Sequence, residues 1–247
     1  DSNLTARAYV SASGSSGTLA AGDYLKEHLN TRIAVVEAEE CPTLIKNGYG
    51  EHNIQGIGDK HVPLIHNVMN TDFVVGVSDQ ATNNLNLIFN TDIGQKYLNT
   101  KKGLDIHFIQ RLPEFGFSAI ANILASIKLS KYMGLGSEDA IITVATDGAE
   151  LYHSELNKMK EDFIGIYDGF ACAEIFGQFL KGISTDNTIE LNQRDKERIF
   201  NLGYYTWVEQ QGIDLNHFEM RKNQNFWNDH YNYMISLDHK VEEFNSM

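Results

Sequence analysis

The residues best suited to chemistry lie in the segment SASGSSGT, which ends at Thr18. Small residues let a ligand approach the main chain, and the hydroxyl groups add hydrogen-bond donors. A helix pattern follows at once, so free main-chain N–H groups converge at a helix N-terminus, where the helix dipole favours an anion. The segment lacks the lysine of a GxxxxGK[ST] loop and the spacing of GxGxxG, so it predicts a site for a compact monophosphate, with a plain turn as the alternative. The candidate ligand residues are Gly14, Ser15, Ser16, Gly17 and Thr18.

Two further segments carry candidate residues. In IQGIGDKHVP, Gly56 and Gly58 leave space for a flat ligand or simply form a tight turn. In TVATDGAELY, Thr146 and Asp147 follow an apolar strand pattern. Ligands bind at the carboxyl ends of parallel strands, although Asp147 could equally cap the helix pattern that follows it.

The elements that must position these residues alternate between strand and helix patterns. Apolar, β-branched runs predict strands that are covered on both faces, and spacings of three and four residues predict helices. The alternation predicts an α/β fold with three layers, in which helices cover both faces of a mainly parallel sheet. The predicted strands are 6–11, 32–38, 73–77 and 140–145, and the predicted helices are 19–29, 83–98 and 118–132.

After Tyr152 the strand-like runs disappear and helical spacing continues to the end of the chain. The sequence therefore predicts an α/β domain over residues 1–152 and a helical C-terminal extension over residues 153–247. The chain opens on Asp1 and enters a strand pattern within a few residues, which favours a fragment whose preceding segment is supplied elsewhere.

Composition excludes several classes of protein. The net charge is −13, the wrong sign for binding nucleic acid or an anionic membrane. No apolar run approaches the ~20 residues of a membrane span, so we expect a cytoplasmic protein. Cys41 and Cys172 are too far apart for a CxxC motif and are predicted to be packing residues. The nine histidines form no recognised ligand motif, so no metal site is predicted.

Four segments follow one another along the chain: YVSASGSSGTLAAGDYLKEHL, VVEAEECPTLIKNGYGEHNIQGIGDKHVPLIHNV, GFSAIANILASIKLSKY and ITVATDGAELY. In order and spacing they resemble the cofactor domain of fold-type-II pyridoxal-phosphate enzymes. The similarity is to the cysteine synthase and cystathionine β-synthase family, and it runs from about Ala8 to Tyr152.

This resemblance implies that residues 14–18 hold the phosphate of pyridoxal 5′-phosphate and that Gly56 and Gly58 border the cofactor and the substrate. It also implies a hydroxyl partner for the pyridine nitrogen after the strand that precedes the tyrosine. The sequence departs from the family pattern there, so we expect Thr146 first and Asp147 second. A carboxylate would hold the ring nitrogen protonated, whereas a hydroxyl would not.

The resemblance places the Schiff-base lysine in a preceding segment that this sequence does not include, so the catalytic residues stay unknown. Lys60 lies near the glycine turn, but a lysine beside Asp59 in a polar turn is expected to be solvated. The chain is therefore predicted to be catalytically incomplete and to need the N-terminal half of the enzyme, from the same gene or a separate chain. The resemblance also implies a homo-oligomer, such as a dimer.

The activity implied is β-replacement on an activated serine with sulfide as the nucleophile. The first alternative is β-elimination or deamination of serine, threonine or cysteine on the same scaffold. The second alternative belongs to another class, a non-catalytic domain that binds phosphate or assembles subunits.

Overall fold

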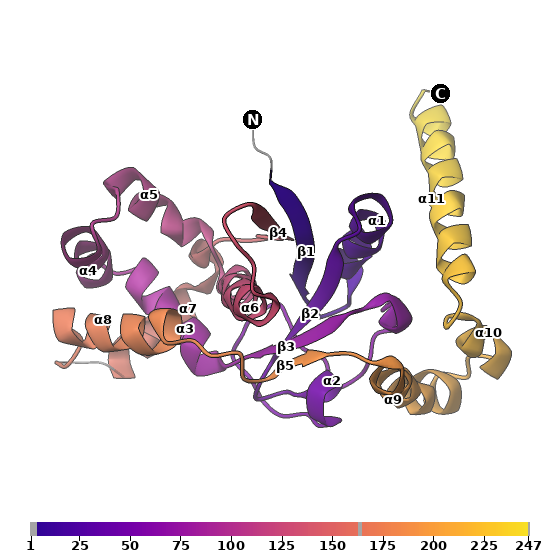
Figure 1. Ribbon diagram of the computed structural model, residues 1–247, viewed down its shortest axis with the longest axis horizontal. Helices are drawn as coiled ribbons and strands as arrows, with labels where there is room; N and C mark the ends of the chain where they lie inside the picture. Colours follow the sequence, from indigo (N-terminus) through magenta and orange to yellow (C-terminus); the bar gives the residue numbers. More distant parts are fainter. Residues whose placement is uncertain (1–3, 163–164, 247) are drawn as a thin grey trace.

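The protein is built around one mixed sheet. The computed structural model describes residues 4–162 and 165–246. The sheet has five strands in the order β4-β1-β2-β3-β5 (Figure 1). The first four strands in this order run parallel, and β5 pairs antiparallel with β3. The strands are β1 (Thr5–Ala12), β2 (Arg32–Ala38), β3 (Phe73–Val77), β4 (Asp139–Thr143) and β5 (Thr188–Glu190).

Both faces of the sheet are covered, which explains why its central strands are apolar throughout. Along β2, Ala34 and Val36 face one core, and Ile33 and Val35 face the other. The first core is completed by α6 (Phe117–Met133) and the second by side chains of α9 (Gln193–Tyr204), while α1 (Ala20–Leu29) packs beside β1 and β2. The three-layer α/β architecture predicted from the sequence is confirmed.

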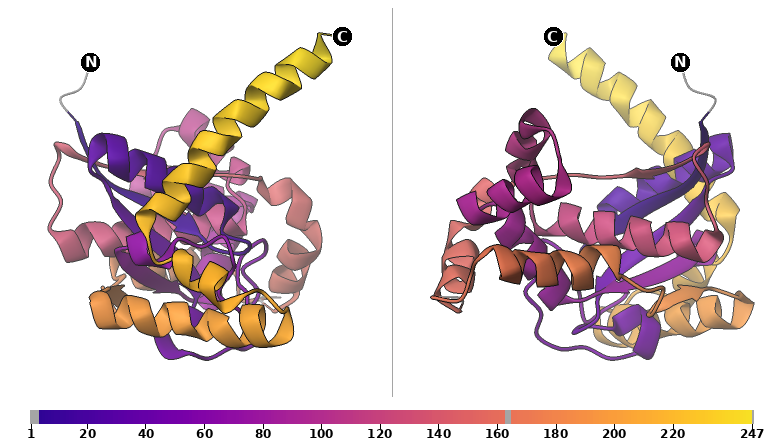
Figure 2. Two further views of the ribbon diagram at one scale, coloured as in Figure 1. Left: turned by 90° about the vertical axis from the view of Figure 1, so that its right-hand side faces the viewer. Right: turned by 60° about the vertical axis from the view of Figure 1, so that its left-hand side comes forward.

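The remaining helices surround this sandwich and extend from it. The long α11 projects away from the body of the protein, as Figure 2 shows. Among the residues described, no helix has both the length and the apolar character needed to cross a membrane. These helices are α2 (Thr43–Lys46), α3 (Asp79–Phe89), α4 (Asp92–Lys102), α5 (Ile106–Arg111), α7 (His153–Asp162), α8 (Gly169–Phe176), α10 (Leu215–Met220) and α11 (Gln224–Asn245).

The single helix predicted over residues 83–98 is wrong, because the chain forms α3 and α4 there instead. Thr91 begins the second helix by accepting the main-chain N–H of Gly94 at 3.1 Å on its hydroxyl. Gly94 also allows a close approach, since a Cβ built on it would lie 2.2 Å from the main-chain oxygen of Ile88. A threonine cap and a tight contact thus end one helix and start the next.

Strands do not end at Tyr152 as the sequence analysis expected. β5 adds to the edge of the sheet beside β3, in the part of the chain predicted to be wholly helical. It has only three residues, TIE, with a single strongly apolar side chain, so alternation could not reveal it. Apart from β5 and the turns and loops, this part of the chain is helical, as predicted.

The boundary at residue 152 stays a proposal about domain organisation. Residues beyond it contribute to both cores of the sheet: Cys172 is buried in one, and Phe200 and Phe218 are buried in the other. Both cysteines are buried and unpaired. The extension therefore shares the hydrophobic core of the sheet.

Candidate cofactor site

The loop between β1 and α1 is the starting point of the site. It leaves the carboxyl end of β1 and enters a short 3₁₀ turn, Gly17–Leu19, that leads into α1. In the described part of the chain, no main-chain N–H of residues 14–18 donates a hydrogen bond to another group. These donors stand at the N-terminal end of the 3₁₀ turn and α1, where the peptide dipoles add positive potential. The loop can therefore surround an anion with main-chain donors.

Hydroxyl groups hold this loop in shape. The Ser16 hydroxyl lies 2.8 Å from that of Ser13, and the Thr18 hydroxyl lies 2.7 Å from that of Ser11. Tyr9 donates from its hydroxyl to the main-chain oxygen of Thr18 at 2.7 Å. Ser16 has a φ of 67°, a left-handed conformation that a non-glycine residue adopts at some cost. Side chains of β1 thus hold the loop in this conformation without a ligand.

A cavity of about 280 Å³ opens beside these donors. Most of the residues proposed from the sequence share it: all five of the loop, with Gly56 from the glycine turn and Thr146 from the segment after β4. Ser118 and Asn122 of α6 also line it, and sequence reasoning missed both. They are polar residues four apart in the first two turns of α6, whose other residues up to Ala125 are apolar, a signal that could have pointed to them.

The two glycines of the second segment have different positions. Both need a positive φ, 81° at Gly56 and 87° at Gly58. Gly58 lies outside the cavity, and its N–H donates to the main-chain oxygen of Ser13 at 2.8 Å. A Cβ at Gly58 would lie 2.2 Å from Nε2 of His52, so a larger residue would have to displace that ring and adopt a strained backbone conformation. Gly56 therefore borders the cavity, while Gly58 ties the turn to the loop.

Thr146 and Asp147 are adjacent but face different surroundings. Thr146 lines the cavity, and its hydroxyl donates to Oδ1 of Asp147 at 3.0 Å. Asp147 is outside the lining, and its other carboxylate oxygen accepts a hydrogen bond from the Tyr152 hydroxyl. Burial, reinforced by the neighbouring carboxylate, raises the pKa of Tyr152 to about 12, so the tyrosine remains a proton donor. Asp147 can act on the cavity through the Thr146 hydroxyl.

Asn122 connects α6 to the segment after β4. Its amide nitrogen donates to the main-chain oxygen of Val144 at 2.9 Å. Its Oδ1 is buried and has no hydrogen-bond partner among the described residues. A buried acceptor without a donor is costly, and at the wall of a cavity it suits a bound polar group or water.

The chemistry of the lining fits a phosphate ester that carries a flat ring. Main-chain N–H groups and hydroxyls bind phosphate at a helix start without needing a basic side chain. No carboxylate or cationic side chain is among the lining residues, so no like charge opposes an anion there. Lys60, considered as a substitute lysine, is exposed and does not line the cavity.

Comparison with known proteins finds one similar sequence and several similar structures. No family model matches the sequence. The chain is 33% identical over 148 residues to cysteine synthase B of Campylobacter jejuni, an alignment that covers 59% of this chain and 42% of that protein. The chain thus spans less than half the length of this curated relative.

Two solved structures share the fold. Cysteine synthase from Entamoeba histolytica has a TM-score of 0.50 and 23% identity, with 72% of this chain and 46% of that chain covered. O-acetylserine sulfhydrylase isoform 3 from the same organism has a TM-score of 0.50 and 20% identity, with 70% and 46% covered. This chain is therefore similar to a cysteine synthase in sequence and to two further enzymes in fold.

Proposed function

We propose that the chain forms the cofactor-binding part of a pyridoxal-phosphate enzyme of the cysteine synthase type. The observation that carries the proposal is the group of free main-chain N–H donors of residues 14–18 at the edge of a cavity of about 280 Å³. In this proposal the loop holds the cofactor phosphate, Gly56 lies beside the ring, and Gly58 keeps the glycine turn against the loop.

When bound, pyridoxal phosphate supplies an electron sink for charge that develops on the α-carbon of an amino acid. The contribution of this chain is to bind and orient. The fixed donors of the loop would hold the phosphate, and the residues at the strand ends would orient the ring.

We assign the ring-nitrogen contact to Thr146 and give Asp147 a role behind it. The Thr146 hydroxyl donates to Oδ1 of Asp147 at 3.0 Å, so its oxygen can act only as an acceptor toward the cavity; the Ser118 hydroxyl lies 3.3 Å from that oxygen. A hydroxyl that donates to the ring nitrogen leaves it unprotonated, as the sequence analysis expected, but a hydroxyl that accepts a hydrogen bond from it favours a protonated ring nitrogen. The carboxylate of Asp147 would support that state without entering the cavity.

The proposed reaction is β-replacement on an activated serine with sulfide as the nucleophile, in line with the names of the relatives. β-Elimination or deamination of serine, threonine or cysteine remains an alternative on the same residues. The Schiff-base lysine is proposed to come from an N-terminal half, in the same polypeptide or another, and the whole enzyme is proposed to be a homodimer. We place it in the cytoplasm, because its two cysteines are buried and unpaired.

The test compares Gly17→Asp with Gly17→Asn in the full-length protein. A side chain at Gly17 has space, since a Cβ there meets nothing closer than 3.8 Å. The two variants have nearly the same shape, but the aspartate puts a negative charge beside the phosphate. We expect Gly17→Asp to weaken binding of pyridoxal phosphate by about tenfold or more relative to Gly17→Asn, measured by titration of the visible absorbance and by calorimetry.

Equal binding of pyridoxal phosphate by the two variants would contradict the proposal that this loop holds the phosphate. A wild-type protein that binds no pyridoxal phosphate would favour the non-catalytic assembly domain instead.

A further inference from the structure

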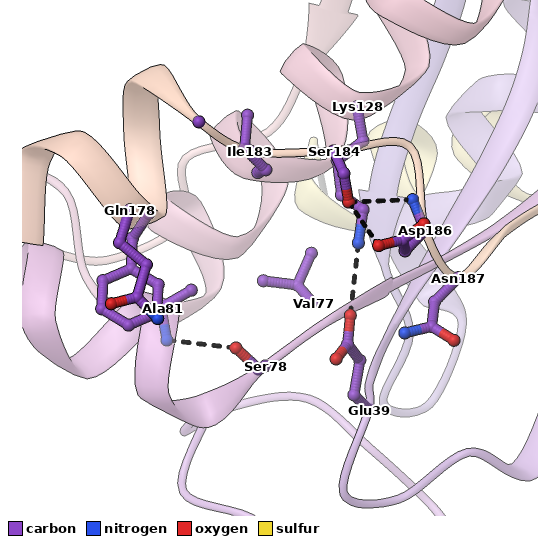
Figure 3. Close-up of a pocket in the computed structure, with 12 residues that line it drawn as sticks. Glu39, Val77, Ser78, Ala81, Lys128, Gln178, Ile183, Ser184, Asp186 and Asn187 are labelled. Carbon is purple, nitrogen blue, oxygen red and sulfur yellow. Dashed lines mark hydrogen bonds and ion pairs between the residues drawn. The ribbon is translucent and has the colours of Figure 1, made fainter.

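A second cavity, of about 270 Å³, lies at the carboxyl ends of β2 and β3. It is bordered by the residues that follow β2 and β3, by α6, and by the segment from the π-helical turn Gly177–Lys181 to Asn187 (Figure 3). Its lining shares no residue with the proposed cofactor cavity. The two cavities are therefore lined by different residues.

A buried lysine distinguishes this cavity. Lys128 of α6 is 5% exposed, although lysine is rarely buried without a reason. Its ammonium donates to the main-chain oxygen of Gly76 at 2.6 Å and to Oε1 of Glu39 at 3.2 Å. An ammonium has three donors, and these contacts use two of them. One N–H of Lys128 remains for a ligand.

Acceptors for a positive charge lie close by. The Glu39 side chain is partly exposed, and its Oε2 accepts no hydrogen bond from the described residues. Asp186 accepts the Ser184 hydroxyl on Oδ2 at 2.7 Å, which leaves Oδ1 open. Figure 3 shows the Lys128 ammonium meeting the Glu39 carboxylate, with the Ser184–Asp186 pair drawn beside them. The polar end of the cavity thus carries one cation and two carboxylates.

The remaining lining is partly apolar, with Val77, Ala81, Phe179 and Ile183, and partly made of neutral polar groups and unusual backbone. The side-chain amides of Gln178 and Asn187 have no hydrogen-bond partner among the residues described. Asn187 has a φ of 55°, and Gln178 belongs to a π-helical turn. Left-handed non-glycine residues and π-helical turns are both rare and occur often at functional sites.

From this geometry we propose that the second cavity binds a small α-amino acid as a zwitterion. Its carboxylate would accept from Lys128, its ammonium would lie between Glu39 and Asp186, and its side chain would reach the amides. A simple anion would face two carboxylates, and a simple amine would face the Lys128 ammonium. A divalent metal would need more oxygen ligands and no cation beside it. The volume is at the lower end for ligand pockets, which limits the amino acid to a small one.

The experiment measures binding to the full-length protein by calorimetry, with L-alanine as the probe. N-acetyl-L-alanine lacks the ammonium, and L-alaninamide lacks the carboxylate. We expect L-alanine to bind and both analogues to bind at least about tenfold more weakly, since each loses a charge-assisted contact. Equal binding of either analogue would overturn the zwitterion assignment, as would the absence of any L-alanine binding.

Substitutions in the lining test whether L-alanine binds in this cavity. Asp186→Asn changes an exposed side chain and is not expected to disturb folding, and Asp238→Asn on the projecting α11 is its matched control. Asp186→Asn and Lys128→Met should each weaken L-alanine binding about tenfold or more, whereas Asp238→Asn should not. If Lys128→Met does not fold, Asp186→Asn alone decides.

Gly17→Asp separates this inference from the proposed function. L-Alanine binding should survive that variant, because the two cavities share no lining residue. Loss of binding in Gly17→Asp with retention in Asp186→Asn would overturn the second site and leave the cofactor site standing.

Discussion

Glu37 is a buried carboxyl group that strengthens the turn after β2. Its two oxygens accept the main-chain N–H groups of Leu44 and Ile45, both at 2.8 Å. Burial nevertheless raises its pKa from 4.5 to about 7, because desolvation of the charged form outweighs these two hydrogen bonds. The residue therefore links the stability of the fold to pH.

The Glu37→Gln variant tests this link. In the unfolded chain the carboxyl group ionises near pH 4.5, but in the fold it does so near pH 7. Between these values the folded state binds more protons, so the free energy of unfolding falls as pH rises, by about 3 kcal/mol at most. Glu37→Gln should lack this fall in urea unfolding measured from pH 4 to 8.

The buried His66 acts in the opposite direction, since burial lowers its pKa to about 4, and it is present in both proteins. The difference between wild type and variant therefore isolates Glu37. Parallel pH profiles for the two proteins would contradict the prediction.

At the scale of single residues, the sequence predicts those site residues whose role follows from the conformation of their own segment of main chain. The glycine and serine loop was found because its donors follow from a strand, a turn and a helix start in direct succession. Ser118 and Asn122 were not, because they reach the cavity only through the packing of α6, about a hundred residues further along the chain. The same holds for the separation of Thr146 from Asp147, since which of two neighbours faces a cavity depends on tertiary contacts.

Helix boundaries show what local patterns leave out. The apolar residues from 83 to 98 continue at helical spacing across the join between α3 and α4, so periodicity alone predicts one helix. The break depends on the Thr91 cap and on Gly94 lying against the last turn of α3. By contrast, β1, β2, β3 and α6 are long and strongly patterned, and their predictions are confirmed within one or two residues.

Gly94→Ala should be strongly destabilising. Its Cβ would lie 2.2 Å from the main-chain oxygen of Ile88 and 2.6 Å from its Cα, and backbone atoms cannot move aside as a flexible side chain can. We expect a loss of about 2 kcal/mol or more in the free energy of unfolding, measured with urea.

Gly169→Ala is the control, because nothing lies within 4 Å of its Cβ and its helical position favours alanine. It should be neutral or slightly stabilising. Equal effects of the two substitutions would mean that the contact with Ile88 does not separate α3 from α4.

In the molecule as a whole, one section of the C-terminal part packs against the sheet and another projects away from it. Its first segments supply β5 and buried side chains such as Cys172 and Phe200. The far half of α11 projects away, and Met234, Val241 and Phe244 on it are exposed (Figure 2). We infer that the stability of the fold depends on the segments that supply β5 and these buried side chains, and not on the far half of α11.

Two truncations test this division. A chain ended after Tyr231 should retain nearly all of the free energy of unfolding, whereas a chain ended after Tyr152 should lose cooperative unfolding because both cores are opened. Circular dichroism during thermal unfolding distinguishes them. A cooperative transition in the shorter chain would support two independent domains divided at residue 152.

The two edges of the sheet are unequal. On one side the outermost strand is β5, which has only three residues. On the other side the outermost strand is β4, which has five, and a shallow hollow with Ile127 and Ile141 lies next to it. An outermost strand offers its peptide groups to any extended chain that comes near. At high protein concentration, self-association is therefore expected to begin along β4, and its onset in light scattering would mark the practical solubility of the chain.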